Sequence, residues 1–154
     1  MIERAGAVLP FGCEQVFDIA ADVERYPEFL PWWISAQVLR RTANGCEVHQ
    51  VVGAGPVRVE FDSKAVFDRP RRIDVTSADP LFRRYELTWL VTPRPAGCSI
   101  GIAVDFELRS RLLQRVLGGL LPGAADGIVR AFDARVHALA GARGAGARGA
   151  GAAP

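Results

Sequence analysis

The amino-acid sequence predicts an α+β domain in which a curved antiparallel sheet of about six to seven strands wraps around a long C-terminal helix. Residues 34–106 alternate between apolar and polar side chains and are divided by turn signals, as strands with one solvated face are. Residues 110–140 then repeat apolar side chains at helical spacing. This last segment can cover the apolar face of the sheet.

The N-terminal part of the chain predicts one strand followed by two short helices. Residues 2–9 are expected to form the strand. A helix is expected over 13–21, because its apolar residues recur at helical spacing and Glu14 lies favourably in its first turn. A second short helix is expected over 24–31, with Pro27 near its start.

Turn signals divide the central part of the chain into strands, and they lie at 44–45, 53–56, 68–70, 79–80 and 93–97. The alternation is clear in the strand that places Val57, Val59, Phe61 and Ala65 on one face and Arg58, Glu60, Asp62 and Lys64 on the other. An antiparallel sheet with one solvated and one apolar face follows.

The C-terminal helix is expected to begin after Ser110 as its N-cap and to stop at Gly141. Pro122 lies in a glycine-rich stretch in its middle and should kink or split the helix, because proline lacks the backbone N–H. Residues 141–154, GARGAGARGAGAAP, hold no apolar side chain larger than alanine and are expected to be a disordered tail. Residues 1–140 are expected to form a single domain.

The charge of the chain does not predict a nucleic-acid partner. The 154 residues carry 19 basic and 17 acidic side chains. Two of the basic residues, Arg143 and Arg148, lie in the tail, which has no acid, so residues 1–140 hold 17 of each sign. DNA binding is therefore not expected, because it needs a clustered basic face.

The cysteines and the N-terminus predict a cytoplasmic protein. Cys13, Cys46 and Cys98 are widely spaced and form no CxxC pair, so neither a disulfide framework nor a zinc site is expected, and a reducing compartment follows. The first residues have an acid beside their base and no long apolar run, so no signal peptide is expected. No apolar run approaches the roughly 18 residues of a membrane span.

Three motifs give the chain a family resemblance that extends over residues 2–140. The run DVERYPEFLPW at 22–32 resembles the signature of the coenzyme Q-binding START-domain proteins, which belong to the helix-grip superfamily with polyketide cyclases and lipid-transfer domains. Pro80-Leu81-Phe82 followed by Trp89 is similar to a second family motif. The third similarity comprises 104–108, 112–113, 128–132 and Arg135.

The resemblance implies a helix-grip fold with a deep apolar cavity between sheet and helix that holds a polyprenyl quinone. Ubiquinone would then be the bound ligand, no cofactor would be required, and the chain would act as a lipid carrier supporting respiratory electron transport. Bacterial relatives are described instead as RatA-like toxins that interfere with ribosomal subunit association, which makes the ribosome an alternative partner. An aromatic polyketide cyclase or dehydratase is the second alternative.

Apolar and aromatic residues on the inward faces are expected to form the cavity walls, although such residues are also common in an ordinary core. The expected ligand-binding residues are Phe29, Leu30, Trp32, Trp33, Phe61, Val75, Tyr85, Leu87, Trp89, Ile102, Val104, Phe106, Leu117, Val129 and Phe132. Trp32 and Trp33, next to prolines, are expected to form a lid that touches the membrane surface. Peripheral contact with the inner face of the membrane follows.

No catalytic residue and no metal ligand set is expected. His49 and His137 are the imidazoles of the chain, and both are expected at the surface or the cavity rim. Asp62 and Asp105 fall on the solvated face of their strands. The cavity then contains no acid–base pair, so the sequence favours binding over catalysis.

Overall fold

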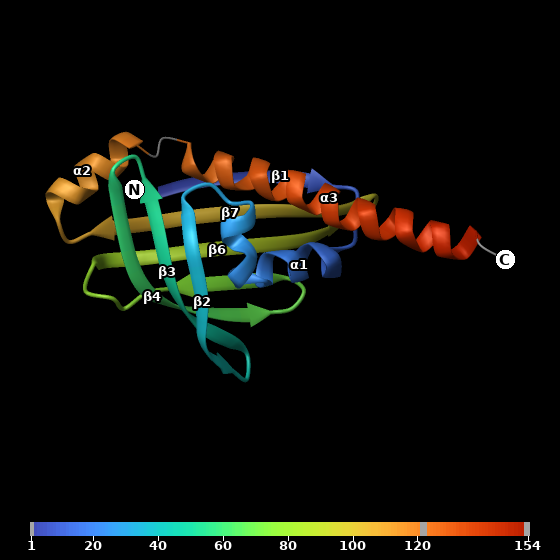
Figure 1. The fold of residues 1–154 in the computed structure, drawn as a ribbon, viewed down its shortest axis with the longest axis horizontal. Coiled ribbons are helices and arrows are strands. Elements are labelled where there is room, and N and C mark those ends of the chain that lie inside the picture. The colour runs from blue at the N-terminus through green and yellow to red at the C-terminus, as the bar shows by residue number, and fades with distance from the viewer. Residues whose placement is uncertain (1, 121–122, 153–154) are drawn as a thin grey trace.

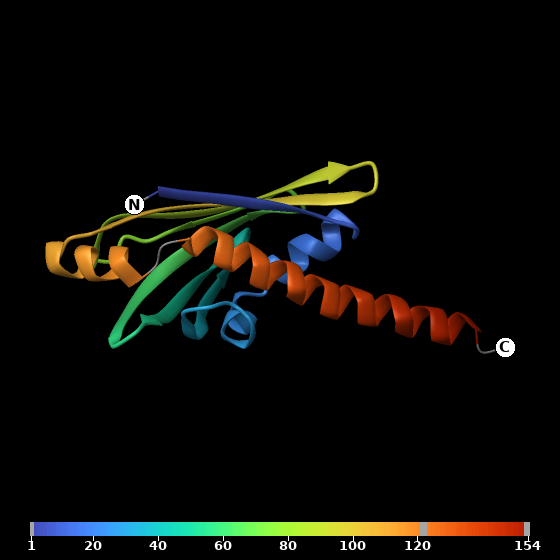
Figure 2. The ribbon, with the colours of Figure 1, turned by 90° about the horizontal axis from the view of Figure 1, so that it is seen from above.

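The strands form one antiparallel sheet whose apolar face is covered by the C-terminal helix (Figures 1 and 2). This computed structural model describes residues 2–120 and 123–152. The seven strands lie in the order β1-β7-β6-β5-β4-β3-β2. Their bounds are β1 (Ile2–Leu9), β2 (Trp33–Thr42), β3 (Gly45–Ala54), β4 (Val57–Asp68), β5 (Arg72–Thr76), β6 (Phe82–Arg94) and β7 (Gly97–Leu108). The helices are α1 (Cys13–Ala21), the 3-10 helix η1 (Val23–Glu28), α2 (Arg111–Leu120) and α3 (Ala124–Ala152).

The predicted α+β helix-grip architecture and strand alternation are confirmed. In β4, Phe61 and Ala65 are buried whereas Arg58 and Glu60 are exposed. In β7, every second residue from Cys98 to Leu108 is buried. A shift of one residue in register would turn each of these side chains to the wrong face, so the apolar pattern fixes the register of the sheet.

The C-terminal helical segment is divided into α2 and α3. The Ser110 hydroxyl accepts a hydrogen bond from the backbone N–H of Leu113 at 3.2 Å, which confirms the predicted N-cap. Gly123 precedes α3 with φ +73°, a conformation that favours glycine. Pro122, which the sequence predicts to kink or split the helix, lies with Leu121 outside the described residues.

The predicted end of the last helix at Gly141 is wrong, because α3 continues to Ala152. The sequence predicts a disordered tail here, whereas the backbone is helical and extends beyond the sheet (Figure 2). Alanine and arginine are strong helix formers, and they alternate with the glycines that oppose helix formation. The division into a domain of residues 1–140 and a tail stays a prediction.

The second short helix is shorter than predicted and covers an edge of the sheet. It is the 3-10 helix η1, and the chain then enters β2 at Trp33. The Tyr26 hydroxyl of η1 donates a hydrogen bond to the backbone carbonyl of Ala20, which ties η1 to α1. A carboxylate oxygen of Glu24 accepts a hydrogen bond from the backbone N–H of Val38 in β2 at 3.3 Å.

The expectation that the cysteines form no disulfide is wrong, because Cys13 and Cys98 are disulfide-bonded. They are 85 residues apart in sequence, but their Cα atoms lie 5.2 Å apart, since the start of α1 lies beside the start of β7. Cys46 is a buried free thiol. The inference of a reducing compartment therefore loses its basis.

Among the described residues, no helix is long and apolar enough to span a membrane.

Candidate ligand cavity

An apolar cavity of about 90 Å³ lies between one end of the sheet and the two C-terminal helices. The ends of β2, β3 and β4 and the inward faces of β6 and β7 form its sheet side, while α2 and the first turns of α3 close the other side. Its lining residues are Trp32, Trp33, Val52, Gly53, Ala54, Val59, Phe61, Phe82, Tyr85, Leu87, Val104, Phe106, Leu108, Leu117, Ala124 and Ile128.

The cavity brings together only part of the predicted wall. The predicted residues that line it are Trp32, Trp33, Phe61, Tyr85, Leu87, Val104, Phe106 and Leu117. The other predicted residues lie outside this lining, namely Phe29, Leu30, Val75, Trp89, Ile102, Val129 and Phe132. Trp89 and Phe132 are fully buried with ring centroids 4.9 Å apart, as ordinary core residues are. Contact of any of these residues with a ligand stays a prediction.

Sequence reasoning missed the lining residues Val52, Gly53, Ala54, Val59, Phe82, Leu108, Ala124 and Ile128. Three of them, Gly53, Ala54 and Ala124, have little or no side chain and therefore leave room for the cavity. Val59 alternates onto the apolar face of its strand with Phe61, so the sequence could have indicated it, whereas no local pattern distinguishes Gly53, Ala54 or Ala124 as lining residues.

Trp32 lies at the cavity in an unusual backbone conformation. Its φ of 71° falls in the left-handed region, which bulky residues rarely adopt. Its indole packs against α3 at Gly127, where a Cβ atom would lie 3.1 Å from Cη2 of Trp32. Trp32 and Trp33 are both half-buried. The two indoles therefore belong to the cavity wall, and little of them is available as an exposed membrane-facing lid.

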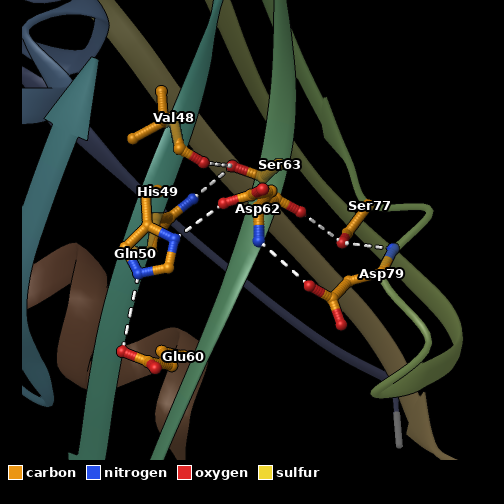
Figure 3. A network of polar contacts seen from close by, with 8 residues as sticks. All are labelled: Val48, His49, Gln50, Glu60, Asp62, Ser63, Ser77 and Asp79. Atoms are coloured by element: carbon orange, nitrogen blue, oxygen red, sulfur yellow. Dashed lines mark hydrogen bonds and ion pairs between the residues drawn. The ribbon is translucent and has the colours of Figure 1, made fainter. Parts of the chain in front are cut away.

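A chain of hydrogen bonds runs beneath the sheet beside the cavity. The Trp33 indole N–H donates to Oε1 of Gln50 at 2.8 Å, and Nε2 of Gln50 donates to the Ser63 hydroxyl at 2.6 Å. Ser63 in turn donates to the backbone carbonyl of Val48 at 3.4 Å (Figure 3). Gln50 and Ser63 are both buried, so this chain compensates for the loss of their hydration.

Tyr85 is the titratable side chain in the described lining of the cavity. Its ring centroid lies 5.1 Å from that of Phe61 and 4.9 Å from that of Phe82. Burial raises the pKa of the Tyr85 hydroxyl well above its ordinary value, because the charged phenolate would lose its hydration. Tyr85 is thus a neutral phenol in an otherwise apolar wall.

Both histidines lie at the surface, as predicted. Nδ1 of His49 lies 2.7 Å from a carboxylate oxygen of Asp62, and its Nε2 lies 3.5 Å from Glu60, all on the solvated face of β3 and β4 (Figure 3). His137 is half exposed and lies 2.9 Å from Asp133 on α3. Neither imidazole lines the cavity. In the described part of the chain, no group of three or more His, Cys, Asp or Glu residues could hold a metal ion.

The fold and the cavity together define a helix-grip protein with an internal apolar site. Residues 9–133 match the family described as polyketide cyclase/dehydrase and lipid transport, and the chain belongs to this family. The resemblance to the RatA-like and coenzyme Q-binding members of the superfamily is confirmed by the relatives that follow.

Two relatives and one solved structure show how close these similarities are. The chain is 30% identical over 141 residues to the ribosome association toxin RatA of Pseudomonas aeruginosa, covering 91% of this chain and 97% of that protein. It is 32% identical over 110 residues to the mitochondrial coenzyme Q-binding protein COQ10 homolog B of Xenopus laevis, covering 68% of this chain and 45% of that protein. The crystal structure of TTHA0849 from Thermus thermophilus matches with a TM-score of 0.79 at 24% identity, covering 90% of this chain and 99% of that chain.

Proposed function

We propose that the protein binds a polyprenyl quinone of the ubiquinone type and carries it, without chemical change, between membrane and protein sites in respiratory electron transport. The observation that carries this proposal is an apolar cavity whose described lining holds no charged side chain and one hydroxyl, that of Tyr85. Similarity to a coenzyme Q-binding protein over 68% of the chain supports it. Catalysis is disfavoured, because general acid–base chemistry needs a positioned proton donor and acceptor.

The size of the cavity suggests how such a ligand would sit. Its volume of about 90 Å³ exceeds several times the roughly 10–15 Å³ that one buried water needs, but it is below the roughly 300–1,000 Å³ of pockets for large ligands. We propose that only the quinone ring occupies this space, since an isoprenoid tail needs more room. We propose that the tail leaves beside α2, which buries Leu117 and exposes Leu112. Gly123, with φ +73° just before α3, would be the joint about which α2 moves in this proposal.

Membrane contact is proposed for α2 rather than for Trp32 and Trp33. The helix carries Arg111 and Arg115 one turn apart and no acidic residue, and its Leu112 is 70% exposed. Basic and apolar side chains on one short helix suit an anionic lipid surface. The protein would then act at the inner face of the membrane from the cytoplasm.

Membrane contact is tested by binding to vesicles that contain an anionic phospholipid. Leu112→Glu should abolish cosedimentation, whereas Val8→Glu on β1, also 70% exposed, should leave it unchanged. Equal losses in the two variants would contradict a specific role of α2.

Carriage is tested by organic extraction of the purified protein and mass spectrometry, followed by titration with a decyl-substituted benzoquinone. Leu117→Trp should fill the cavity and abolish both the co-purified quinone and the binding. Val8→Trp places the same side chain at an exposed position of β1, away from α2, and should leave both unchanged. A wild-type protein that holds no quinone and binds none would overturn the proposal.

A second candidate function, interference with ribosomal subunit association, is favoured by the similarity to RatA over 91% of the chain. Its test is the sedimentation profile of ribosomes after addition of the purified protein. A loss of joined ribosomes that persists in the Leu117→Trp variant would favour this function over carriage.

A further inference from the structure

The Tyr85 hydroxyl belongs to the cavity wall and makes no hydrogen bond to the described part of the protein. The side chain is 9% exposed, lies on the inward face of β6 and lines the cavity. The Tyr85 ring packs against those of Phe61 and Phe82, and the Tyr26 side chain lies near enough to interact with Tyr85 electrostatically. A hydroxyl that opens on an apolar cavity and has no partner in the described part of the protein can donate a hydrogen bond to an acceptor on a ligand.

Two other polar side chains beneath the sheet, Tyr26 and Gln50, have partners within the protein. The Tyr26 hydroxyl donates to the Ala20 carbonyl. The Gln50 amide accepts a hydrogen bond at its oxygen and donates one from its nitrogen. The Trp89 indole N–H makes no hydrogen bond of ordinary geometry, but Trp89 is fully buried and does not line the cavity. A ligand can therefore reach the Tyr85 hydroxyl and cannot reach Trp89.

The surroundings of Tyr85 restrict which kind of ligand can accept a hydrogen bond from its hydroxyl. The rings of Phe61 and Phe82 lie at 4.8 Å from each other and close around the Tyr85 ring, so they hold the phenol in place and favour a flat apolar neighbour. Burial raises the pKa of the hydroxyl, which keeps its proton available for donation. The rest of the described lining offers no side-chain charge to a ligand, so an anionic or cationic head group would lose its hydration without compensation.

We propose that the Tyr85 hydroxyl donates a hydrogen bond to a ring carbonyl oxygen of the bound molecule, so that the cavity selects a quinone or similar ring ketone over a hydrocarbon of the same shape. This inference rests on the proposed function and names the group that sets its specificity. Tyr85 is thus a specificity-determining residue, and the aromatic walls supply affinity that does not depend on the oxygen.

The test compares two probes, a decyl-substituted benzoquinone and decylbenzene, by calorimetric titration. Tyr85→Phe should weaken quinone binding roughly three- to tenfold, as the loss of one neutral hydrogen bond does, and leave decylbenzene binding unchanged or tighter. Thr88→Val is the control, because it removes from the same strand a hydroxyl that donates to Asp74 and does not line the cavity, and it should leave the preference between the two probes unchanged. The infrared carbonyl band of the bound quinone should be shifted to lower frequency in the wild type and not in Tyr85→Phe.

The outcomes separate this inference from the proposed function. If the wild type binds both probes equally, or if Tyr85→Phe keeps the full preference for the quinone, the role of Tyr85 is overturned while carriage of an apolar molecule stands. If the wild type binds neither probe, both proposals fail. The infrared band of the wild-type complex needs no variant, so an unshifted carbonyl band would overturn the role of Tyr85 even if the variant did not fold.

Discussion

The Trp32 indole packs directly on the backbone of Gly127, and a side chain at residue 127 would have to share this space. The contact joins the segment before β2 to the first turn of α3, and both residues lie at the cavity end of the molecule. Glycine is unfavourable within a helix by about 1 kcal/mol relative to alanine. Glycine at position 127 therefore lowers the stability of the helix but allows the Trp32 indole to pack closely against it.

Gly127→Ala should stabilise the protein by clearly less than the roughly 1 kcal/mol gained by this substitution in an open helix, because the indole must move. Gly119→Ala in α2 is the matched control, since a Cβ there meets nothing within 4 Å. Urea unfolding measures both changes. An equal gain at the two positions would show that the contact with Trp32 imposes no constraint.

Gln50→Leu should lower the free energy of unfolding by about 1–3 kcal/mol, because the Trp33 indole N–H and the Ser63 hydroxyl lose their bonds to the amide. Gln37→Leu, at an exposed position on the neighbouring β2, should change the stability little. Addition of Ser63→Ala to Gln50→Leu should cost less than Ser63→Ala alone, and additive costs would contradict a connected chain.

His49 should titrate above the ordinary histidine value of about 6.5, because its hydrogen bond to Asp62 and then its contact with Glu60 stabilise the charged ring. Asp62→Asn should lower the His49 pKa, as followed by NMR, and Asp74→Asn, at a carboxylate paired with Arg72, should not. Because the folded-state pKa is raised, the stabilising contribution is fully present below about pH 6.5 and is lost as pH rises through the raised pKa. A stability difference between wild type and Asp62→Asn that grows with pH would contradict this.

Thiol labelling of the unfolded, unreduced protein should detect one cysteine, Cys46, because Cys13 and Cys98 are joined. Reduction should lower the free energy of unfolding by about 2–4 kcal/mol, since the bond closes a long loop. The Cys13→Ser variant should not respond to reductant. Three labelled thiols in the wild type would contradict the bond.

The sequence predicts the order of the elements well because strand and helix periodicities are local properties. The inward and outward faces of β4 and β7 follow from alternation alone, and the N-cap at Ser110 follows from one side chain and its neighbours. The extent of the last helix was harder to predict, since glycine, alanine and arginine in one segment have opposing propensities.

The cavity could be predicted only in part, because alternation shows which face a side chain is on and not what lies opposite. Tyr85 and Trp89 both point inward from β6, yet Phe132 of α3 packs on Trp89 while Tyr85 faces the space near the break between α2 and α3. The disulfide was missed for a similar reason, since the meeting of Cys13 and Cys98 depends on where α1 lies relative to β7.

Because η1 packs along the edge strand β2, it affects whether two copies of the chain can associate through that strand. An outermost strand offers unpaired backbone groups to which a second chain can add, which is a common route to aggregation. Here Glu24 occupies the N–H of Val38, pairing shifts near Trp33 and Val38 interrupt the regular edge, and Arg40 and Arg41 add charge. The β2 border of the sheet is thus closed to the addition of a strand from a second copy of the chain.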